Sequence, residues 1–206
     1  GRPRRPRRGA DAPQATMVQP IPGHSTPGVG FEVPLEMLAA CHLRVHGQCQ
    51  TLQRLVPHLA AHGADRQARE AAVAVMRYFD TSARHHHADE ETDLFPALLE
   101  SMAGSDAVCL RELTAALTAE HRALEQRWGR LRLSLGAVAS GAAATLAADD
   151  VQAFVDLYEM HIAREEAELL PMAARLLDEA TLDRIGLAMR TRRGAVGVDT
   201  PVAPFS

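Results

Sequence analysis

Two segments of the chain carry the same arrangement of imidazole and carboxylate side chains. Residues 86–96 read HHADEETDLFP and residues 161–171 read HIAREEAELLP, and six of the eleven positions are identical. Each copy places a glutamate four residues after a histidine, so in a helix both side chains lie on one face and can reach a common centre. Imidazole and carboxylate together form a ligand set suited to iron, manganese or zinc. The pairs are His86 with Glu90 and His161 with Glu165.

A further histidine precedes each pair and extends the repeat. His42 comes 44 residues before His86, and His121 comes 40 residues before His161. Each half of the chain therefore supplies one histidine from one helix and a His-x-x-x-Glu pair from the next. Two such hairpins packed face to face would gather four histidines and two glutamates. This pattern predicts two metal ions joined by two carboxylates.

A single His-x-x-x-Glu pair is more often a salt link on a helix surface than a metal site, so the prediction depends on the repeat. The same spacing also joins His87 to Glu91. His87, however, aligns with Ile162 in the second copy, so only the register of His86 and Glu90 is shared by both halves. His87 and Glu91 are therefore secondary candidates, for contacts around the ligands or for the surface.

The elements that would position these residues are four long helices. Aromatic residues make up only 4% of the chain, and its apolar residues are mainly Ala and Leu, which favours helices over strands. Apolar spacing and Gly boundaries predict helices over residues 34–62, 65–102, 106–135 and 149–178. Short links between them predict an all-α, up-down-up-down four-helix bundle with a short C-terminal fifth helix. Pro96 and Pro171 fall inside the second and fourth helices and are expected to bend them.

The segments outside the four long helices are predicted to be an N-terminal arm, a loop, a short helix and a C-terminal tail. Residues 1–33 are rich in Arg, Pro and Gly without apolar periodicity, which predicts a flexible arm. Small residues over 136–144 predict a flexible loop between the third and fourth helices. The bundle is predicted to occupy residues 34–178, the short helix residues 179–194, and a tail residues 195–206.

Charge and cysteine content narrow the classes of partner and compartment. All 22 basic residues are arginine, and five of them precede every acidic residue, so the body of the protein is acidic. An acidic body argues against nucleic acid as a partner. No stretch approaches roughly 18 apolar residues, which predicts no membrane span. Three cysteines without a disulfide framework indicate reduced thiols and a cytoplasmic protein. The basic arm could contact an anionic partner or lie upstream of a start at Met17, and the oligomeric state is open.

At these residues the chain resembles the hemerythrin-like HHE cation-binding family, over about residues 36–175. The motifs that carry the resemblance are His42, the two repeated segments and the Glu120–His121 pair. It implies a four-helix bundle with two iron ions, bridged by an oxo or hydroxo group and by two carboxylates. Mapped onto this sequence, the resemblance implies the ligands His42, His86, His121 and His161 and the bridging carboxylates Glu90 and Glu165.

One position departs from the oxygen-carrying members of that family. They look as if they use a fifth histidine one turn after His121, where this chain has Glu125. Glu125 could replace that ligand, the iron could keep an open position, or His46, one turn after His42, could supply the fifth imidazole. Simple reversible oxygen carriage is therefore in question. Ferritin-like di-iron proteins need Glu-x-x-His motifs, and this sequence contains none.

Different classes of function follow from an iron pair. An iron pair with an open coordination position predicts a protein that binds or senses oxygen, nitric oxide or peroxide. The alternative is an enzyme with peroxidase- or catalase-like turnover, with Glu125 as a general base, or a role in iron storage or repair. A structural bundle that holds zinc is a third possibility. Trp128 and Phe79, each seven residues from a histidine of the repeat, could shape a dry pocket or could be ordinary core aromatics.

Overall fold

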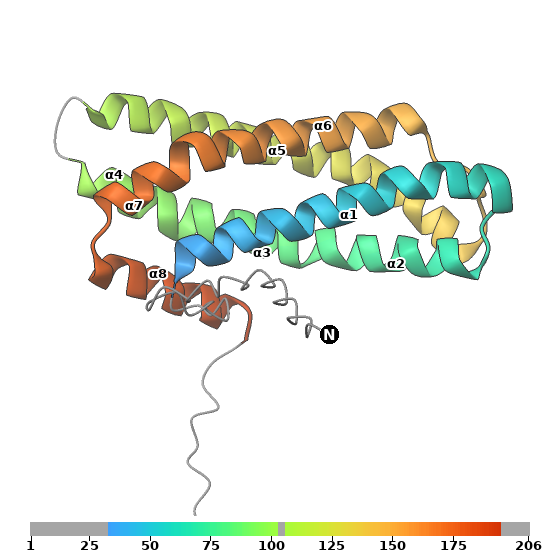
Figure 1. Ribbon diagram of the computed structural model, residues 1–206, viewed down its shortest axis with the longest axis horizontal. Helices are drawn as coiled ribbons and strands as arrows, with labels where there is room; N and C mark the ends of the chain where they lie inside the picture. The colour runs from blue at the N-terminus through green and yellow to red at the C-terminus, as the bar shows by residue number, and fades with distance from the viewer. Residues whose placement is uncertain (1–32, 103–105, 195–206) are drawn as a thin grey trace, which may run out of the picture.

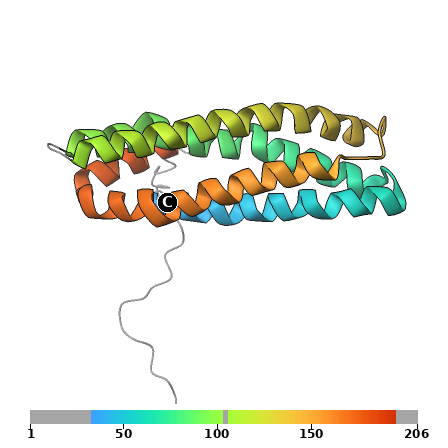
Figure 2. The ribbon, with the colours of Figure 1, turned by 90° about the horizontal axis from the view of Figure 1, so that it is seen from above.

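Four helical rods lie side by side and make up most of the molecule (Figures 1 and 2). The computed structural model describes residues 33–102 and 106–194. Consecutive rods run in opposite directions, and the first and third rods each pack against the second and the fourth. The described residues form helices and turns without a strand, which confirms the prediction of an all-α protein. The predicted arm over 1–33, apart from its last residue, and the tail over 195–206 lie outside the described residues.

The rods differ in how many helices they contain. The first rod is the single helix α1 (Pro34–His62), and the third is the single helix α5 (Asp106–Ser140). The second rod is built from α2 (Arg66–Asp80), α3 (Ser82–Asp89), the π-helical turn η1 (Glu90–Leu94) and α4 (Phe95–Ser101). The fourth rod is built from α6 (Ala148–Arg164), the π-helical turn η2 (Glu165–Leu169) and α7 (Leu170–Leu176), and helix α8 (Glu179–Arg192) follows it.

Helix α1 spans the predicted residues because its two ends are marked by backbone chemistry. Pro34 occupies the first turn, where an N–H has no partner within the helix. Gly63 ends the helix with a φ of 67°, a conformation that glycine adopts without strain. The amide of Gly63 donates to the carbonyl of Leu59 over 2.9 Å, which satisfies one of the last carbonyls.

The second and fourth rods each contain a π-turn at the repeated Glu-Pro segment. In η1 the amide of Phe95 donates to the carbonyl of Glu90, five residues back instead of four. Pro96 follows at once and has no N–H, so the ordinary hydrogen-bond ladder cannot continue through it. The turn takes up one extra residue before the ladder resumes. The turn η2 repeats this pattern with Leu170, Glu165 and Pro171.

Three predicted elements differ from the structure: the second helix, the fourth helix and the loop between the third and fourth helices. The predicted helices 65–102 and 149–178 are not single bent helices, because each is interrupted by a π-turn, and the second rod also breaks at Thr81. The predicted loop 136–144 is helical as far as Ser140. A glycine inside a helix costs only about 1 kcal/mol relative to alanine, and the burial of Leu135 and Val138 on either side of Gly136 outweighs that cost.

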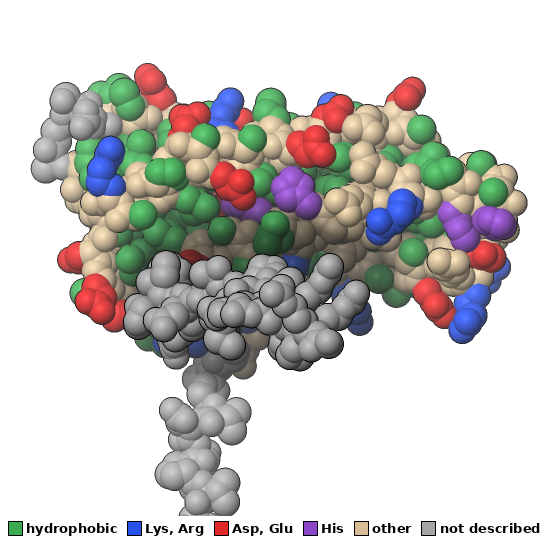
Figure 3. Space-filling model, in the orientation of Figure 1, with side chains coloured by type: hydrophobic (Ala, Val, Ile, Leu, Met, Phe, Trp, Pro, Cys, Tyr) green, Lys and Arg blue, Asp and Glu red, His purple; other side chains and the backbone are tan. Residues whose placement is uncertain are grey.

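Two apolar clusters fill the interior and leave a polar layer between them. The larger cluster contains Leu52 and Phe154, and the smaller one contains Leu38 and Leu98. Acidic and basic side chains are scattered over the outer face seen in Figure 3. No described helix is long and apolar enough to cross a membrane. All three cysteines are free thiols.

Helix α8 is fastened to the second rod by ion pairs around one buried carboxylate. It packs against α1, α3 and η1. Asp89, which is fully buried, accepts hydrogen bonds from the guanidinium groups of Arg192 and Arg193, and Arg192 also donates to Asp93 over 2.6 Å. We call these four residues the clamp. The clamp ties α8 to the residue that directly precedes η1.

Candidate metal centre

Six polar side chains meet in the layer between the two apolar clusters. Each of them is at most 3% exposed. All four rods contribute, so the bundle itself brings together residues that lie far apart in the sequence. The six are the histidines and glutamates that the repeat predicts: His42, His86, Glu90, His121, His161 and Glu165.

Their ligand atoms form two overlapping groups. The atoms of each group lie within 4.8 Å of one another, close enough to hold one ion. Both groups contain Glu90 and Glu165. The first group adds His42 and His86, and the second adds His121 and His161.

The carboxylate of Glu165 divides its two oxygens between these groups. Its Oε2 atom lies 3.0 Å from Nε2 of His42 and 3.9 Å from Nε2 of His86. Its Oε1 atom lies 2.9 Å from Nε2 of His161 and 3.8 Å from Nε2 of His121. One oxygen therefore faces each pair of imidazoles.

Glu90 is arranged in the same way from the opposite rod. Its Oε1 atom lies 3.5 Å from Nε2 of His86, and its Oε2 atom lies 3.3 Å from Nε2 of His121. Each carboxylate starts a π-turn at the matching place in the repeat, so both are presented to the interior by the same local geometry. Glu90 and Glu165 therefore each contact both groups of histidines, one glutamate from the second rod and the other from the fourth.

The donor atoms fit metal cations better than they fit one another. Both oxygens of Glu90 and of Glu165 are buried without a hydrogen-bond partner, although an unpaired buried carboxylate costs several kcal/mol. Nε2 of His42 is close to Glu165 but also lacks hydrogen-bond geometry. The Nε2 atoms of His121 and His161 lie 3.2 Å apart. Two nitrogens bound at right angles to one ion, each about 2.1 Å away, would be separated by about 3 Å.

The pKa values of the clustered residues also show that the carboxylates and imidazoles stabilise each other's charged forms. Burial works against ionisation of Glu165, but the neighbouring imidazoles of His121 and His161 outweigh it and hold its pKa well below the ordinary value. Burial likewise opposes protonation of His121, yet the carboxylates of Glu165 and Glu90 raise its pKa to about 9. The cluster therefore holds an anionic carboxylate at Glu165 that requires positive charge beside it.

Three of the four imidazoles are oriented by carboxylates at their other nitrogen. This arrangement fixes the ring and makes it a stronger metal ligand. Two of the three carboxylates come from matching places, one residue after the shared glutamates. The contacts are His42 Nδ1 with Glu166 at 3.0 Å, His121 Nδ1 with Glu91 at 2.7 Å, and His161 Nδ1 with Glu120 at 2.9 Å.

Glu91 is predicted from the sequence as a candidate for a contact around the ligands, whereas Glu166 and Glu120 are not, although the repeat contains a signal for Glu166. Both copies have two consecutive glutamates, so the secondary candidate Glu91 has its counterpart in Glu166. Glu91, a secondary candidate, lies at the outer nitrogen of His121 and also pairs with Arg122. When the two halves are aligned, Cys41 of the first half stands where the second half has Glu120, the residue that contacts His161. His86, the counterpart of His161, therefore has no matching carboxylate, and its Nδ1 atom has no hydrogen-bond partner.

The other secondary candidate, His87, lies inside the layer. It is 6% exposed, and its ring stacks on that of His121 with centroids 4.0 Å apart. Adjacent helical residues point about 100° apart, so His86 faces α1 while His87 faces α5. Its Nε2 atom has no hydrogen-bond partner, and its ligand atom lies within 4.8 Å of those of His121 and His161.

The two residues expected to complete the coordination lie outside the cluster. The side chain of Glu125 is 47% exposed and accepts a hydrogen bond from Arg122 over 2.7 Å. His46 is half-buried. Neither belongs to any group of clustered ligand atoms among the described residues. Arg122, three residues earlier on the same helix, holds the carboxylate of Glu125 at the surface.

The region of the chain that matches a known protein family includes the whole of this site. The sequence profile of the hemerythrin HHE cation binding domain matches residues 33–173. An uncharacterized protein of Haemophilus influenzae is 31% identical over 160 residues, which cover 78% of this chain and 90% of that protein. Both the residues of the cluster and the π-turns lie within the profile match.

Proposed function

Because the chain belongs to the hemerythrin HHE cation-binding domain family, we propose that its buried cluster holds two iron ions and binds oxygen, nitric oxide or peroxide there. The division of both shared carboxylates between two imidazole pairs carries this proposal. His42 and His86 would hold the first ion, His121 and His161 would hold the second, and Glu90 and Glu165 would contribute to both.

The two ions would not be equivalent. His87 is placed to give the second ion a third imidazole, and the matching residue in the other half is Ile162, which offers no ligand atom. The group with His42 and His86 therefore offers one protein ligand fewer, and we assign the binding of the small ligand to that side. Iron held there supplies affinity for such ligands together with one-electron redox chemistry.

The protein's own residues supply orientation and a dry environment. Glu166, Glu91 and Glu120 fix the imidazole rings, and burial of the cluster keeps bulk water away from it. The enzyme alternative assigned a general base to Glu125, and the pairing of that side chain with Arg122 at the surface favours the binding role instead.

Metal analysis tests the proposal directly. Protein purified from iron-replete cells should contain about two iron ions per chain, one for each group of donors, and little zinc. Anaerobic loading followed by oxygen should change the absorbance of the iron. A reproducible content near one iron per chain, or zinc in place of iron, would contradict the di-iron assignment.

The third imidazole gives a second test with a matched control. His87→Ala should lower the affinity for one of the two ions, on the order of 100-fold, because it removes a direct ligand. Glu125→Ala should leave iron content unchanged, since that carboxylate lies at the surface. Competition with a chelator measures both variants. The reverse ranking would show that Glu125 and not His87 completes the coordination.

A further inference from the structure

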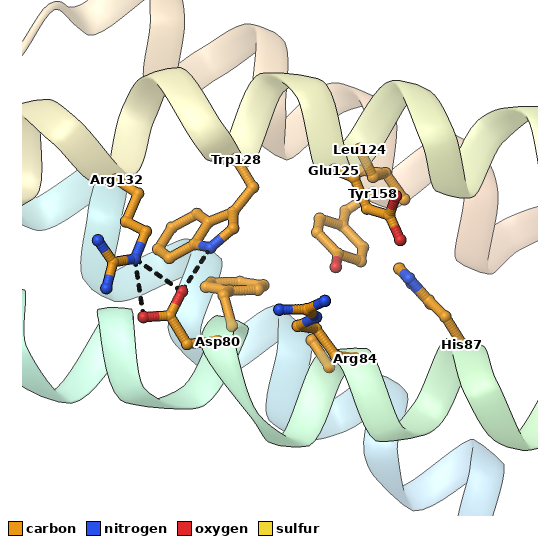
Figure 4. A pocket seen from close by; sticks show the side chains of 10 residues that line it. Asp80, Arg84, His87, Leu124, Glu125, Trp128, Arg132 and Tyr158 are labelled. Atoms are coloured by element: carbon orange, nitrogen blue, oxygen red, sulfur yellow. Dashed lines mark hydrogen bonds and ion pairs between the residues drawn. The ribbon is translucent and has the colours of Figure 1, made fainter.

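A cleft of about 570 Å³ opens beside His87, between α2 and α3 on one side and α5 on the other (Figure 4). Pockets for small organic molecules have volumes of roughly 300–1,000 Å³, whereas a diatomic gas needs only a small fraction of that space. The cleft therefore offers room for a larger molecule next to the proposed second ion. Its lining includes Phe79, Arg84, His87, Leu124, Trp128 and Tyr158.

One wall of the cleft is a rigid aromatic surface. The ring of Phe79 lies 4.9 Å from that of Trp128 and 5.5 Å from that of Tyr158, measured between centroids. The indole N–H of Trp128 donates to Asp80 over 2.9 Å, which fixes its orientation. Aromatic walls of this kind bind another ring by stacking or edge contacts.

The cleft also presents one arginine that has no charged partner among the described residues. Each of its two acidic residues already has an arginine partner: Asp80 pairs with Arg132 at 2.8 Å, and Glu125 pairs at 2.7 Å with Arg122, which also contacts Glu91. Within the described part of the chain, Arg84 makes no ion pair or hydrogen bond, and Figure 4 shows its guanidinium group reaching into the cleft. This charge favours an anionic occupant.

The imidazole of His87 adds a second polar contact at the inner end. Three clustered imidazoles have a carboxylate at Nδ1, but His87 has no hydrogen bond to any described residue. Its ring lines the cleft, so a partner for its outer nitrogen can come from the occupant. Arg84 and His87 are three residues apart on α3 and therefore lie on one side of the helix. A single carboxylate can accept from both.

We propose that this cleft binds a small aromatic carboxylic acid, with its carboxylate on Arg84 and His87 and its ring against Phe79, Trp128 and Tyr158. The acid would orient His87 in the same way that Glu91 orients His121. This inference rests on the proposed di-iron site for the position of His87, and it adds an organic ligand to that site.

Calorimetric titration of the iron-loaded protein with three probes tests both halves of the proposal. Benzoate should bind, while benzyl alcohol, which keeps the ring, and acetate, which keeps the charge, should bind at least about tenfold more weakly. The chain has a single tryptophan, so its fluorescence reports occupancy of the cleft directly. Equal binding of benzoate and benzyl alcohol would overturn recognition of an anion, and equal binding of benzoate and acetate would overturn the aromatic wall.

A charge-neutral variant locates the contact. Arg84→Gln should weaken benzoate about tenfold or more without changing benzyl alcohol, and Arg130→Gln, an exposed arginine outside the cleft, should change neither. Equal effects of the two variants would overturn the proposal. Iron content measured on the same samples separates the two hypotheses. A protein that holds two irons but ignores benzoate overturns the cleft alone, and one that binds benzoate without holding iron overturns the di-iron site alone.

Discussion

Replacing Glu165 by alanine should remove iron from both positions at once. Its two oxygens face the two imidazole pairs separately, so the substitution takes one ligand from each ion and also removes a bridging charge between them. We expect each ion to bind on the order of 100-fold more weakly or worse, by comparison with the 10- to 100-fold losses caused by changes outside the ligand set. Iron per chain after gel filtration measures the effect.

A neighbouring glutamate provides the control for this variant. Glu168 belongs to the same π-turn but is exposed, so Glu168→Ala should keep the full iron content. Circular dichroism of both variants checks that the helices are intact. If Glu165→Ala kept one tightly bound iron while Glu168→Ala kept two, Glu165 would be a ligand of a single ion and not a bridge.

Iron-free protein should be more stable near pH 6.5 than above pH 9. The pKa of His121 rises from its ordinary 6.5 to about 9 in the folded protein. Its contribution, on the order of 3 kcal/mol, is fully present below pH 6.5 and is lost as the pH rises through 9. The pKa of His42 is raised by Glu165 despite burial, so it acts in the same direction.

Two groups set the acidic limit of this stability window. The lowered pKa of Glu165 contributes stability above its ordinary value of 4.5, which is lost as the pH falls towards the lower pKa in the folded protein. Burial lowers the pKa of His87, so protonation of the unfolded chain below pH 6.5 disfavours folding. The melting temperature of the iron-free protein should therefore peak near pH 6.5.

Iron should reverse the alkaline part of this profile. Metal binding requires neutral imidazoles, so iron displaces protons and stabilises the fold more as the pH rises. The difference in melting temperature between loaded and iron-free protein should widen from pH 6.5 to pH 9. Calorimetric melting with and without iron measures it. Iron-free protein that melts higher above pH 9 would contradict the assigned imidazole–carboxylate contacts.

The sequence predicts the rods better than it predicts their interruptions. Pro34 and Gly63 mark the ends of α1 through local backbone chemistry, which a sequence shows directly. The π-turn η1 forms because the amide of Phe95 donates to the carbonyl five residues back, next to Pro96, which has no N–H to donate. Apolar periodicity does not show which carbonyl accepts that hydrogen bond. The helix through Gly136 similarly depends on tertiary burial of its neighbours.

For the site, the repeat predicts what the halves share and not where they differ. His86 and His161 are brought together in the cluster because both halves present them in the same register. His87 faces α5 from a position where the other half has Ile162, so alignment of the halves does not reveal that its ring lies against His121. Glu125 was proposed from its spacing to His121, but spacing does not show that Arg122 would hold it at the surface.

The clamp has a consequence for the order of events during protein synthesis. Asp89 is buried against arginines that follow it by more than a hundred residues. A nascent chain that has released all four rods still lacks the partners of that carboxylate, and an unpaired buried charge is strongly disfavoured. The segment that presents His86, His87 and Glu90 therefore reaches its final packing only after Arg193 leaves the ribosome. Metal ions at the proposed site would accordingly be bound in its final geometry only after α8 has been synthesised.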